Sequence, residues 1–381
     1  MKASTSLRRA AVLCLVSLLA TACEGSKQSA PTTTTAAVAS GGEAAEGGDP
    51  VEAILPVKPE TGVLAERGFS AGPIASTGTH LFWEAARDQE GGDVFLVGRN
   101  LATRTTRVFA HNLSPLFGLA STSDSLVFAT HGSAGTDLVT TDLSGGHRRV
   151  LSNSLAAPFD ARGDIVAWAE QVGDRQRVVT LDFRTGRRLV VLDAVRCRRG
   201  RCYRIDRVTV ARDGVAFDLG SVGQGYPSLV ARRSWRGART EFTPVPHDPQ
   251  PDLARSAEGA LYYQLRRGWF EWKFGEDRPR AIAPAKTWLL ETQGGRRLVL
   301  RGGACSASVG VVDSSGRVTP LPAPRSTPAS PTQFGPLCRQ LTGLVWSGSR
   351  LLIGWSFTPK VSIEGHNDVG LSGLITTVGV P

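Results

Sequence analysis

The 381-residue sequence predicts an all-β fold, a β-propeller of seven four-stranded blades, from three observations. The composition favours turns, with 43 Gly and 22 Pro against a single Met, and the apolar runs are short. Short runs of β-branched and aromatic residues are separated by turn residues, as in a meander of strands. These runs recur with a mean period of about 45 residues, which is the length of one four-stranded blade.

The first 22 residues have the composition of an export signal. Basic residues precede an apolar run at 10–20, which is too short to span a bilayer permanently. The run leads into Leu-Ala-Thr-Ala-Cys at 19–23, and small residues directly before a cysteine resemble the lipobox of bacterial lipoproteins. The resemblance implies that residues 1–22 are removed and that Cys23 becomes a diacylated N-terminus, anchored stably by two acyl chains. Ordinary secretion and twin-arginine export through Arg8-Arg9 are the alternatives.

Residues 23–50 are predicted to form a flexible linker. Thr, Ala, Ser, Gly and Glu dominate from Glu24 to Asp49, and no aromatic residue occurs there. Such a segment buries too little apolar area to fold, and as a coil of about 26 residues it would average roughly 30 Å end to end. The predicted organisation is therefore a signal peptide at 1–22, a linker at 23–50 and a propeller domain at 51–381.

Seven copies of the repeat align on the apolar core of the second strand of each blade. Their third residues are separated by 45, 40, 49, 46, 37 and 54 positions. The uneven last intervals leave six or eight blades as alternatives. The cores are Leu81–Trp83, Leu126–Phe128, Val166–Trp168, Val215–Phe217, Leu261–Tyr263, Leu298–Leu300 and Leu352–Gly354. The predicted blades span about 72–112, 116–153, 157–194, 203–243, 250–283, 286–322 and 340–380.

A second repeated element marks the turn between third and fourth strands. Asp142 and Asp182 are each followed by Gly four residues later and Arg six residues later, and Asp313 begins a shorter copy. We expect each Asp to close a hairpin turn through its side chain, with Gly146, Gly186 and the matching glycine at positive φ. These residues are predicted to be structural.

The whole pattern resembles the TolB-like and YWTD-like propellers of bacterial envelope lipoproteins over about residues 54–381. The Ser-Pro-Asp-Gly turn that is typical of TolB repeats is absent from this sequence. The last copy offers only three strands, and propellers usually close by taking a strand from the other terminus. The apolar segment 52–57 is predicted to pair with the C-terminal blade.

Four cysteines remain once the signal peptide and the lipidated residue are set aside. In an exported protein they suggest two disulfides, for which three pairings exist. The short spacing favours Cys197 with Cys202, which leaves Cys305 with Cys338. Metal binding is the alternative, although no His lies near either pair in the sequence.

Positive charge is concentrated in one part of the chain. Residues 184–241 hold fourteen Arg and five acidic residues, a balance of +9, whereas the mature chain carries +7 in all. A basic sector favours anionic partners. A disulfide-held tip would present its arginines with little loss of entropy on binding. The candidate contact residues are Arg196, Arg198, Arg199, Arg201, Arg204 and Arg207, and an arginine-rich surface without a partner is the alternative.

The sequence holds no linear motif of a catalytic or metal site. The six His are scattered, and neither a His-Glu-x-x-His nor a Gly-x-Ser-x-Gly motif occurs. We therefore predict no catalytic residue, metal or cofactor, and favour a monomeric, non-enzymatic binding or scaffolding module of the cell envelope. Its expected partners are the membrane, through Cys23, and an envelope protein or anionic polymer, with no nucleic acid. It would lie on the outer face of the cytoplasmic membrane, in the periplasm or at the outer membrane.

The alternative function is a propeller enzyme, such as a hydrolase, lyase or quinoprotein-like dehydrogenase, or a sensor of small ligands. Either would place its site in the central channel, where a propeller assembles residues from many loops. A fold of this kind supports all three classes of function, so the sequence leaves the choice between them open.

Overall fold

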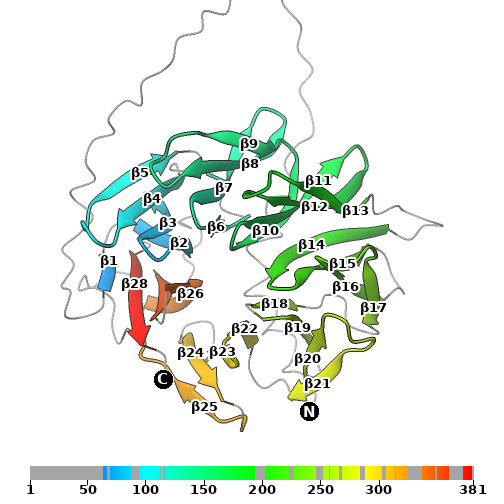
Figure 1. The fold of residues 1–381 in the computed structure, drawn as a ribbon. Coiled ribbons are helices and arrows are strands. Elements are labelled where there is room, and N and C mark those ends of the chain that lie inside the picture. The colour runs from blue at the N-terminus through cyan, green and yellow to red at the C-terminus, as the bar shows by residue number, and fades with distance from the viewer. Residues whose placement is uncertain are drawn as a thin grey trace, which may run out of the picture. The chain divides into compact units, whose positions relative to one another are not determined.

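The computed structural model describes residues 63–379, with gaps at 67–68, 88–93, 112, 115–116, 194–201, 223–226, 246–251, 257, 266–267, 284–287, 303–305, 314, 325–336, 348–349 and 360–371. Residues 50–381 form one compact unit. Every element in the described part of this unit is a β-strand, and the strands form seven blades around a central axis (Figure 1). Within the same residues, no helix is long and apolar enough to cross a membrane.

The first four blades are separate antiparallel sheets whose strands follow chain order from the axis outward. Blade one holds β2 (Phe69–Ser76), β3 (His80–Arg87), β4 (Val94–Asn100) and β5 (Thr106–Ala110). Blade two holds β6 (Leu119–Ser121), β7 (Ser125–Gly132), β8 (Gly135–Asp142) and β9 (Arg149–Ser152). Blade three holds β10 (Leu155–Arg162), β11 (Ile165–Val172), β12 (Arg175–Asp182) and β13 (Arg188–Leu192). Blade four holds β14 (Cys202–Ala211), β15 (Gly214–Val222), β16 (Ser228–Ser234) and β17 (Glu241–Val245).

The remaining blades complete the ring. Blade five holds β18 (Asp252–Ser256), β19 (Ala260–Leu265), β20 (Gly268–Lys273) and β21 (Arg280–Ala283). Blade six holds β22 (Trp288–Gln293), β23 (Arg296–Arg301), β24 (Ser308–Val312) and β25 (Val318–Pro320). Blade seven holds β26 (Leu337–Ser347), β27 (Arg350–Pro359), β28 (Ser372–Gly379) and β1 (Val63–Glu66). Two parallel residue pairs between β18 and β22 join blades five and six into one eight-stranded sheet.

The predicted second-strand cores all lie in the second strand of a blade, so the assignment of seven blades is confirmed. In β11, three consecutive residues, Val166, Ala167 and Trp168, are buried. A strand in the middle of a blade is covered on both faces by the neighbouring blades, which explains a continuous apolar run instead of alternation. The repeat period of the sequence therefore reflects one fully buried strand in each blade.

Seven apolar clusters hold the ring together, one between each pair of adjacent blades. Trp168 packs between blades two and three, Trp272 between four and five, and Trp355 between six and seven. Trp83 lies in the cluster that joins blades seven and one. Because each cluster draws on two blades, a blade cannot bury its apolar faces without both neighbours.

Closure of the ring by an N-terminal strand is confirmed, but the strand is not the predicted one. β1 pairs antiparallel with β28, with Val63 opposite Thr376 and Glu66 opposite Leu374 (Figure 1). The predicted segment 52–57 lies outside the described residues. Only two residues separate β1 from β2, so β1 can leave the edge of blade seven and enter the inner strand of blade one directly. Both segments are short and apolar, and the sequence pattern did not distinguish them.

The aspartate turns have the predicted role. The Oδ1 atom of Asp142 accepts hydrogen bonds from the backbone N–H groups of Ser144 and Gly146, both at 2.8 Å. Asp182 and Asp313 each accept two backbone hydrogen bonds in the same way. In blade two, however, the positive φ of 80° belongs to Gly145 and not to Gly146. The turn tightens one residue earlier than the alignment of the repeats implied.

Candidate functional site

The inner strands of all seven blades surround a central cavity of about 360 Å³. Its wall includes Ile74, Leu119, Phe159, Val208, Leu253, Leu290 and Leu344. The pairing register shifts at this depth in β2, β10, β14, β22 and β26. A bulge leaves an inner-strand residue outside the ladder, so Pro73 and Pro158 fit there without losing a ladder hydrogen bond.

Charged groups near the axis are engaged with one another and with the backbone. Asp160 Oδ2 accepts hydrogen bonds from Thr209 Oγ1 at 3.0 Å and from the Val210 N–H at 2.9 Å, which links blade three to blade four. Arg162 Nη2 of blade three lies 3.6 Å from Glu291 Oε1 of blade six, so this ion pair connects blades on different sides of the ring. The cavity therefore combines apolar walls with polar groups held in fixed positions, which suits a small ligand.

Two buried carboxyl groups stand behind this wall. Asp218 in β15 accepts a hydrogen bond from the Arg207 N–H at 2.6 Å, at the bulge of β14. Burial, with the charge of Asp206, raises the pKa of Asp218 to about 7. Glu84 occupies the corresponding position in β3, opposite the bulge that contains Pro73, which has no N–H to donate. Its carboxyl oxygens have no hydrogen-bond partner in the described part of the chain, and burial raises its pKa to about 8.

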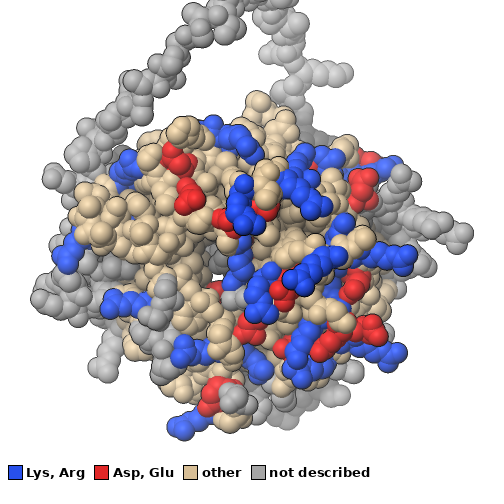
Figure 2. Space-filling model, in the orientation of Figure 1, with Lys and Arg blue, Asp and Glu red and all other residues tan. Residues whose placement is uncertain are grey.

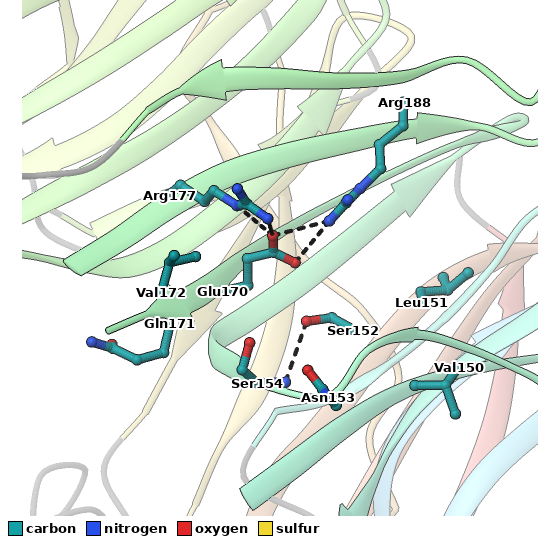
Figure 3. A pocket seen from close by; sticks show the side chains of 10 residues that line it. All are labelled: Val150, Leu151, Ser152, Asn153, Ser154, Glu170, Gln171, Val172, Arg177 and Arg188. Atoms are coloured by element: carbon teal, nitrogen blue, oxygen red, sulfur yellow. Dashed lines mark hydrogen bonds and ion pairs between the residues drawn. The ribbon is translucent and has the colours of Figure 1, made fainter. Parts of the chain in front are cut away.

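A second hollow, the blade-three groove, has a volume of about 500 Å³ and lies beside the connection from β9 to β10 (Figure 3). Its lining includes Val150, Ser154, Glu170, Val172, Arg177 and Arg188. Glu170 is buried, and both guanidinium groups point at its carboxylate (Figure 3). Arg177 Nε lies 2.5 Å from Glu170 Oε1, and Arg188 Nη2 lies 2.9 and 3.0 Å from the two carboxylate oxygens.

Glu170 stays ionised although it is buried. Burial alone would raise the pKa of Glu170, but hydrogen bonds from Trp168 and Arg177 and the charge of Arg188 together hold it below its ordinary value. The Trp168 indole donates to Oε2 at 3.0 Å, and the Arg188 guanidinium lies 5.7 Å from the centre of the Trp168 ring. The carboxylate of Glu170 therefore keeps its negative charge and holds the guanidinium groups of Arg177 and Arg188 in place.

The predicted arginine site is described only in part. Arg204 is exposed and donates from Nε to Asp206 Oδ1 at 2.6 Å. Arg207 lines the central cavity, and its Nη1 donates to the Leu253 carbonyl at 2.8 Å. Arg207 thus belongs to the channel wall in this structure. The other candidates, Arg196, Arg198, Arg199 and Arg201, lie outside the described residues, as does the predicted lipidation site Cys23.

Lys and Arg side chains gather over the part of the ring built from β10 to β21 (Figure 2). Described arginines that are exposed within the basic sector 184–241 are Arg184, Arg187, Arg188, Arg204, Arg207, Arg212, Arg236 and Arg239. Arg232 differs from them because it is buried, bonded to Glu241 at 2.6 Å and placed 3.9 Å from the centre of the Trp272 ring. Most of the described positive charge of the sector therefore faces solvent.

The predicted disulfides fall at the edges of the described residues. Cys197 and Cys305 lie outside them, and of Cys202 and Cys338 only the backbone is described. However, Ser306 and Arg339, which directly follow Cys305 and Cys338, form a parallel bridge. Arg339 Nε also donates to the Ala307 carbonyl at 2.7 Å. These contacts hold the two chain segments together independently of any covalent bond.

We expect non-reducing peptide mapping of the protein, produced with export to an oxidising compartment, to find Cys305 linked to Cys338, because parallel bridging places neighbouring residues of two segments close together. A Cys305→Ser, Cys338→Ser variant should leave the second linkage, Cys197 with Cys202, intact. Recovery of a peptide that links Cys197 or Cys202 to Cys305 would show that this pairing is wrong.

No protein-family model and no curated protein sequence matches the chain. Solved structures do. The β-propeller domain of the Trilobed protease from Pyrococcus furiosus, described as having an open velcro topology, matches with a TM-score of 0.54 and 9% identity over 77% of this chain and 92% of that one. A prolyl endopeptidase matches with a TM-score of 0.56 and 12% identity over 78% of this chain.

The likeness is one of fold alone. The chain spans 47% of the length of the prolyl endopeptidase, at 12% identity. TolB from Acinetobacter baumannii is also similar, at 13% identity over 79% of this chain and 81% of that one, with a TM-score of only 0.38. The matches with TM-scores above 0.5 support a β-propeller fold, and the expected resemblance is confirmed to that extent only. In the described residues, no group of three or more His, Cys, Asp or Glu could hold a metal ion.

The two hollows differ in how far the sequence indicated them. The channel follows from any propeller, whereas the blade-three groove depends on Glu170, Arg177 and Arg188, which lie on three different strands. A usable signal was present for the buried carboxyls, because Glu84 and Asp218 each directly follow an apolar second-strand core where blades two and three have alanine. An acidic residue at such a position is an exception worth testing.

Proposed function

We propose that the protein is a non-enzymatic binding or scaffolding module of the cell envelope, anchored by lipid at Cys23, whose propeller docks an anionic partner. The observation that carries this proposal is the concentration of exposed arginines on blades three and four. The sector has a balance of +9, whereas the rest of the mature chain is close to neutral. A charge asymmetry of this kind attracts acidic surfaces over several ångströms and orients them before contact.

The anchor and the ring have complementary parts in this proposal. A diacyl chain at Cys23 would confine the protein to the membrane surface, and a coil at 23–50 would let the propeller reach a partner at a distance of roughly 30 Å. The ring then supplies a large surface that carries the exposed arginines of blades three and four. The partner is an acidic envelope protein or an anionic envelope polymer.

In-cell crosslinking of the full-length protein tests this function. The altered form carries Arg198→Glu, Arg199→Glu and Arg201→Glu in the predicted tip. A matched control carries Arg278→Glu, Arg296→Glu and Arg317→Glu, which makes the same charge change at residues outside the basic sector. We expect a defined envelope protein or polymer to be captured by the native form and the control, and to be reduced at least tenfold with the tip variant.

Equal capture by all three forms would exclude the predicted tip as the contact site. Capture of no specific partner by the native form would count against a scaffolding role altogether. The abundance and processing of each form must be equal for the comparison, and this is measured by blotting the membrane fraction.

A second candidate function, a small-ligand sensor or an enzyme with a channel site, is favoured by the central cavity. Its volume of about 360 Å³ suits a small molecule, and Asp218, with a pKa raised to about 7, lies directly behind its wall. A Leu290→Trp substitution would fill part of this cavity. If the channel is the functional site, that substitution should abolish ligand binding or enzyme activity. The tip variant should retain it.

A further inference from the structure

We propose that the blade-three groove is a specific site for the carboxylate of an acidic peptide segment. The inference goes beyond the proposed function because it depends neither on the lipid anchor nor on the predicted tip. Both proposals share an anionic partner, but they place its contacts on different arginines. The groove lies where β9 passes into β10 and where the end of β11 meets the start of β12 (Figure 3).

The groove holds more positive than negative charge. Arg177 and Arg188 share the single carboxylate of Glu170, which leaves one positive charge uncompensated in this cluster. Within the described residues, every side-chain hydrogen bond of these two arginines goes to Glu170. A guanidinium has five N–H donors, so donors on both side chains are free for a ligand. Arg188 is 47% exposed, and a ligand can therefore reach it from solvent.

The guanidinium groups are already fixed before a ligand arrives. Glu170 holds both from below, and the Trp168 ring lies beneath Arg188. An arginine that is free in solution loses considerable side-chain entropy when it binds, whereas one that is already held loses little. A planar guanidinium also matches the two oxygens of a carboxylate. The cluster thus has the features of a built receptor for a carboxylate.

Apolar residues at the rim point to a peptide as the source of that carboxylate. Five large hydrophobic side chains of the described residues are exposed, and Val150 and Val172, at 51% and 45%, line this groove. Val190 is a third, two residues from Arg188 in β13. An inorganic anion would use none of them. A peptide in which an acidic residue is flanked by aliphatic side chains would use both the valines and the arginines.

Neutral polar groups complete the lining. Ser152, Asn153, Ser154 and Gln171 border the groove, and the backbone N–H of Gln171 donates to the Ser154 carbonyl at 2.7 Å. This bond fixes the connection between blades two and three against the end of β11. Serine and asparagine side chains can donate a hydrogen bond to a peptide carbonyl and can accept one from a peptide N–H. The volume of about 500 Å³ lies within the usual range for ligand sites.

Isothermal titration of the full-length protein with short peptides tests the site. The probes are acetyl-Leu-Val-Glu-Val-amide, its Gln counterpart, and acetyl-Leu-Val-Gln-Val with a free C-terminus, which separates a side-chain carboxylate from a terminal one. The variants are Arg177→Gln with Arg188→Gln, and Arg188→Lys alone. The control is Arg184→Gln with Arg187→Gln, which changes charge equally in the neighbouring turn but leaves the groove unaltered.

We expect at least one carboxylate peptide to bind and the neutral peptide to bind at least tenfold more weakly. The double groove variant should lose this preference, Arg188→Lys should lose most of it because a lysine lacks the planar fork, and the control should keep it. Equal loss in the control variant would reduce the effect to general charge, and an absence of binding by every peptide would overturn the proposal. Peptide binding in the groove without tip-dependent capture would support this proposal alone, and tip-dependent capture without peptide binding would support only the proposed function.

Discussion

Deleting Val63–Glu66 is expected to lower the melting temperature of the protein by about 10 °C or more, a shift that corresponds to several kcal/mol for a domain of this size. β1 is the fourth strand of blade seven and covers the edge of β28. Without it, the unpaired backbone groups of β28 would be exposed, and the ring would be held at the junction of blades seven and one by side-chain packing alone.

Differential scanning fluorimetry and size-exclusion chromatography measure this effect. A deletion of Thr32–Thr35 removes an equal length of chain from the predicted linker and serves as the control. We expect that control to melt like the intact protein and the β1 deletion to form aggregates through the exposed edge. If the β1 deletion melts normally as a monomer, ring closure by this strand contributes little to stability.

Replacing Glu84 by Gln is expected to stabilise the protein at pH 8 by about 4 kcal/mol and to have little effect at pH 4. The native carboxyl keeps its proton up to a pKa of about 8, whereas in the unfolded chain it loses that proton near its ordinary value of 4.5. Unfolding therefore releases a proton between these pH values. The free energy of unfolding of the native protein should fall as the pH rises from 4.5 to 8, and the substitution removes this loss.

Urea unfolding at pH 4.5, 6 and 8 measures both the direction and the size of the change in the free energy of unfolding. Asp218→Asn serves as a comparison, because burial raises the pKa of Asp218 to about 7 and its stability cost should develop over a lower pH range. Asn keeps an oxygen that can accept the Arg207 N–H bond. A native protein whose stability is flat or rises between pH 4.5 and 8, with no gain from Glu84→Gln, would mean that the buried carboxyl is solvated or paired.

The sequence was sufficient for features that repeat and insufficient for those that occur once. Second-strand cores such as Val166–Trp168 recur in every blade because each blade must bury its middle strand, and a periodic pattern records that burial directly. The closing strand occurs once. Two short apolar segments could have filled that role, and the pairing of β1 with β28 identifies the one that does.

The sites were harder to predict for a related reason. The groove combines Glu170, Arg177 and Arg188 from three strands, and the channel ion pair joins Arg162 to Glu291 across 129 positions of the sequence. Neither spacing belongs to a linear motif, because a propeller brings together residues from different strands and blades. The basic sector was visible as composition, yet composition could not separate a surface arginine from the buried Arg232.

Stability and binding draw on the same charges in blade three. Glu170 is compensated by two arginines, which holds their guanidinium groups and leaves one positive charge for a partner. A buried carboxylate that loses such partners becomes strongly unfavourable. The geometry of the groove therefore depends on the packing between blades two and three, where Trp168 lies.

The most direct test of the account is the binding of the full-length protein to poly-L-glutamate, measured by fluorescence anisotropy from 50 to 300 mM NaCl. An anionic polymer that docks on the basic sector should bind more weakly as salt screens the charges. The Arg198→Glu, Arg199→Glu, Arg201→Glu form and the Arg177→Gln, Arg188→Gln form should each bind at least tenfold more weakly at low salt. Binding that is independent of salt, and equal in native and altered forms, would contradict the claim that this propeller docks anionic partners through its arginines.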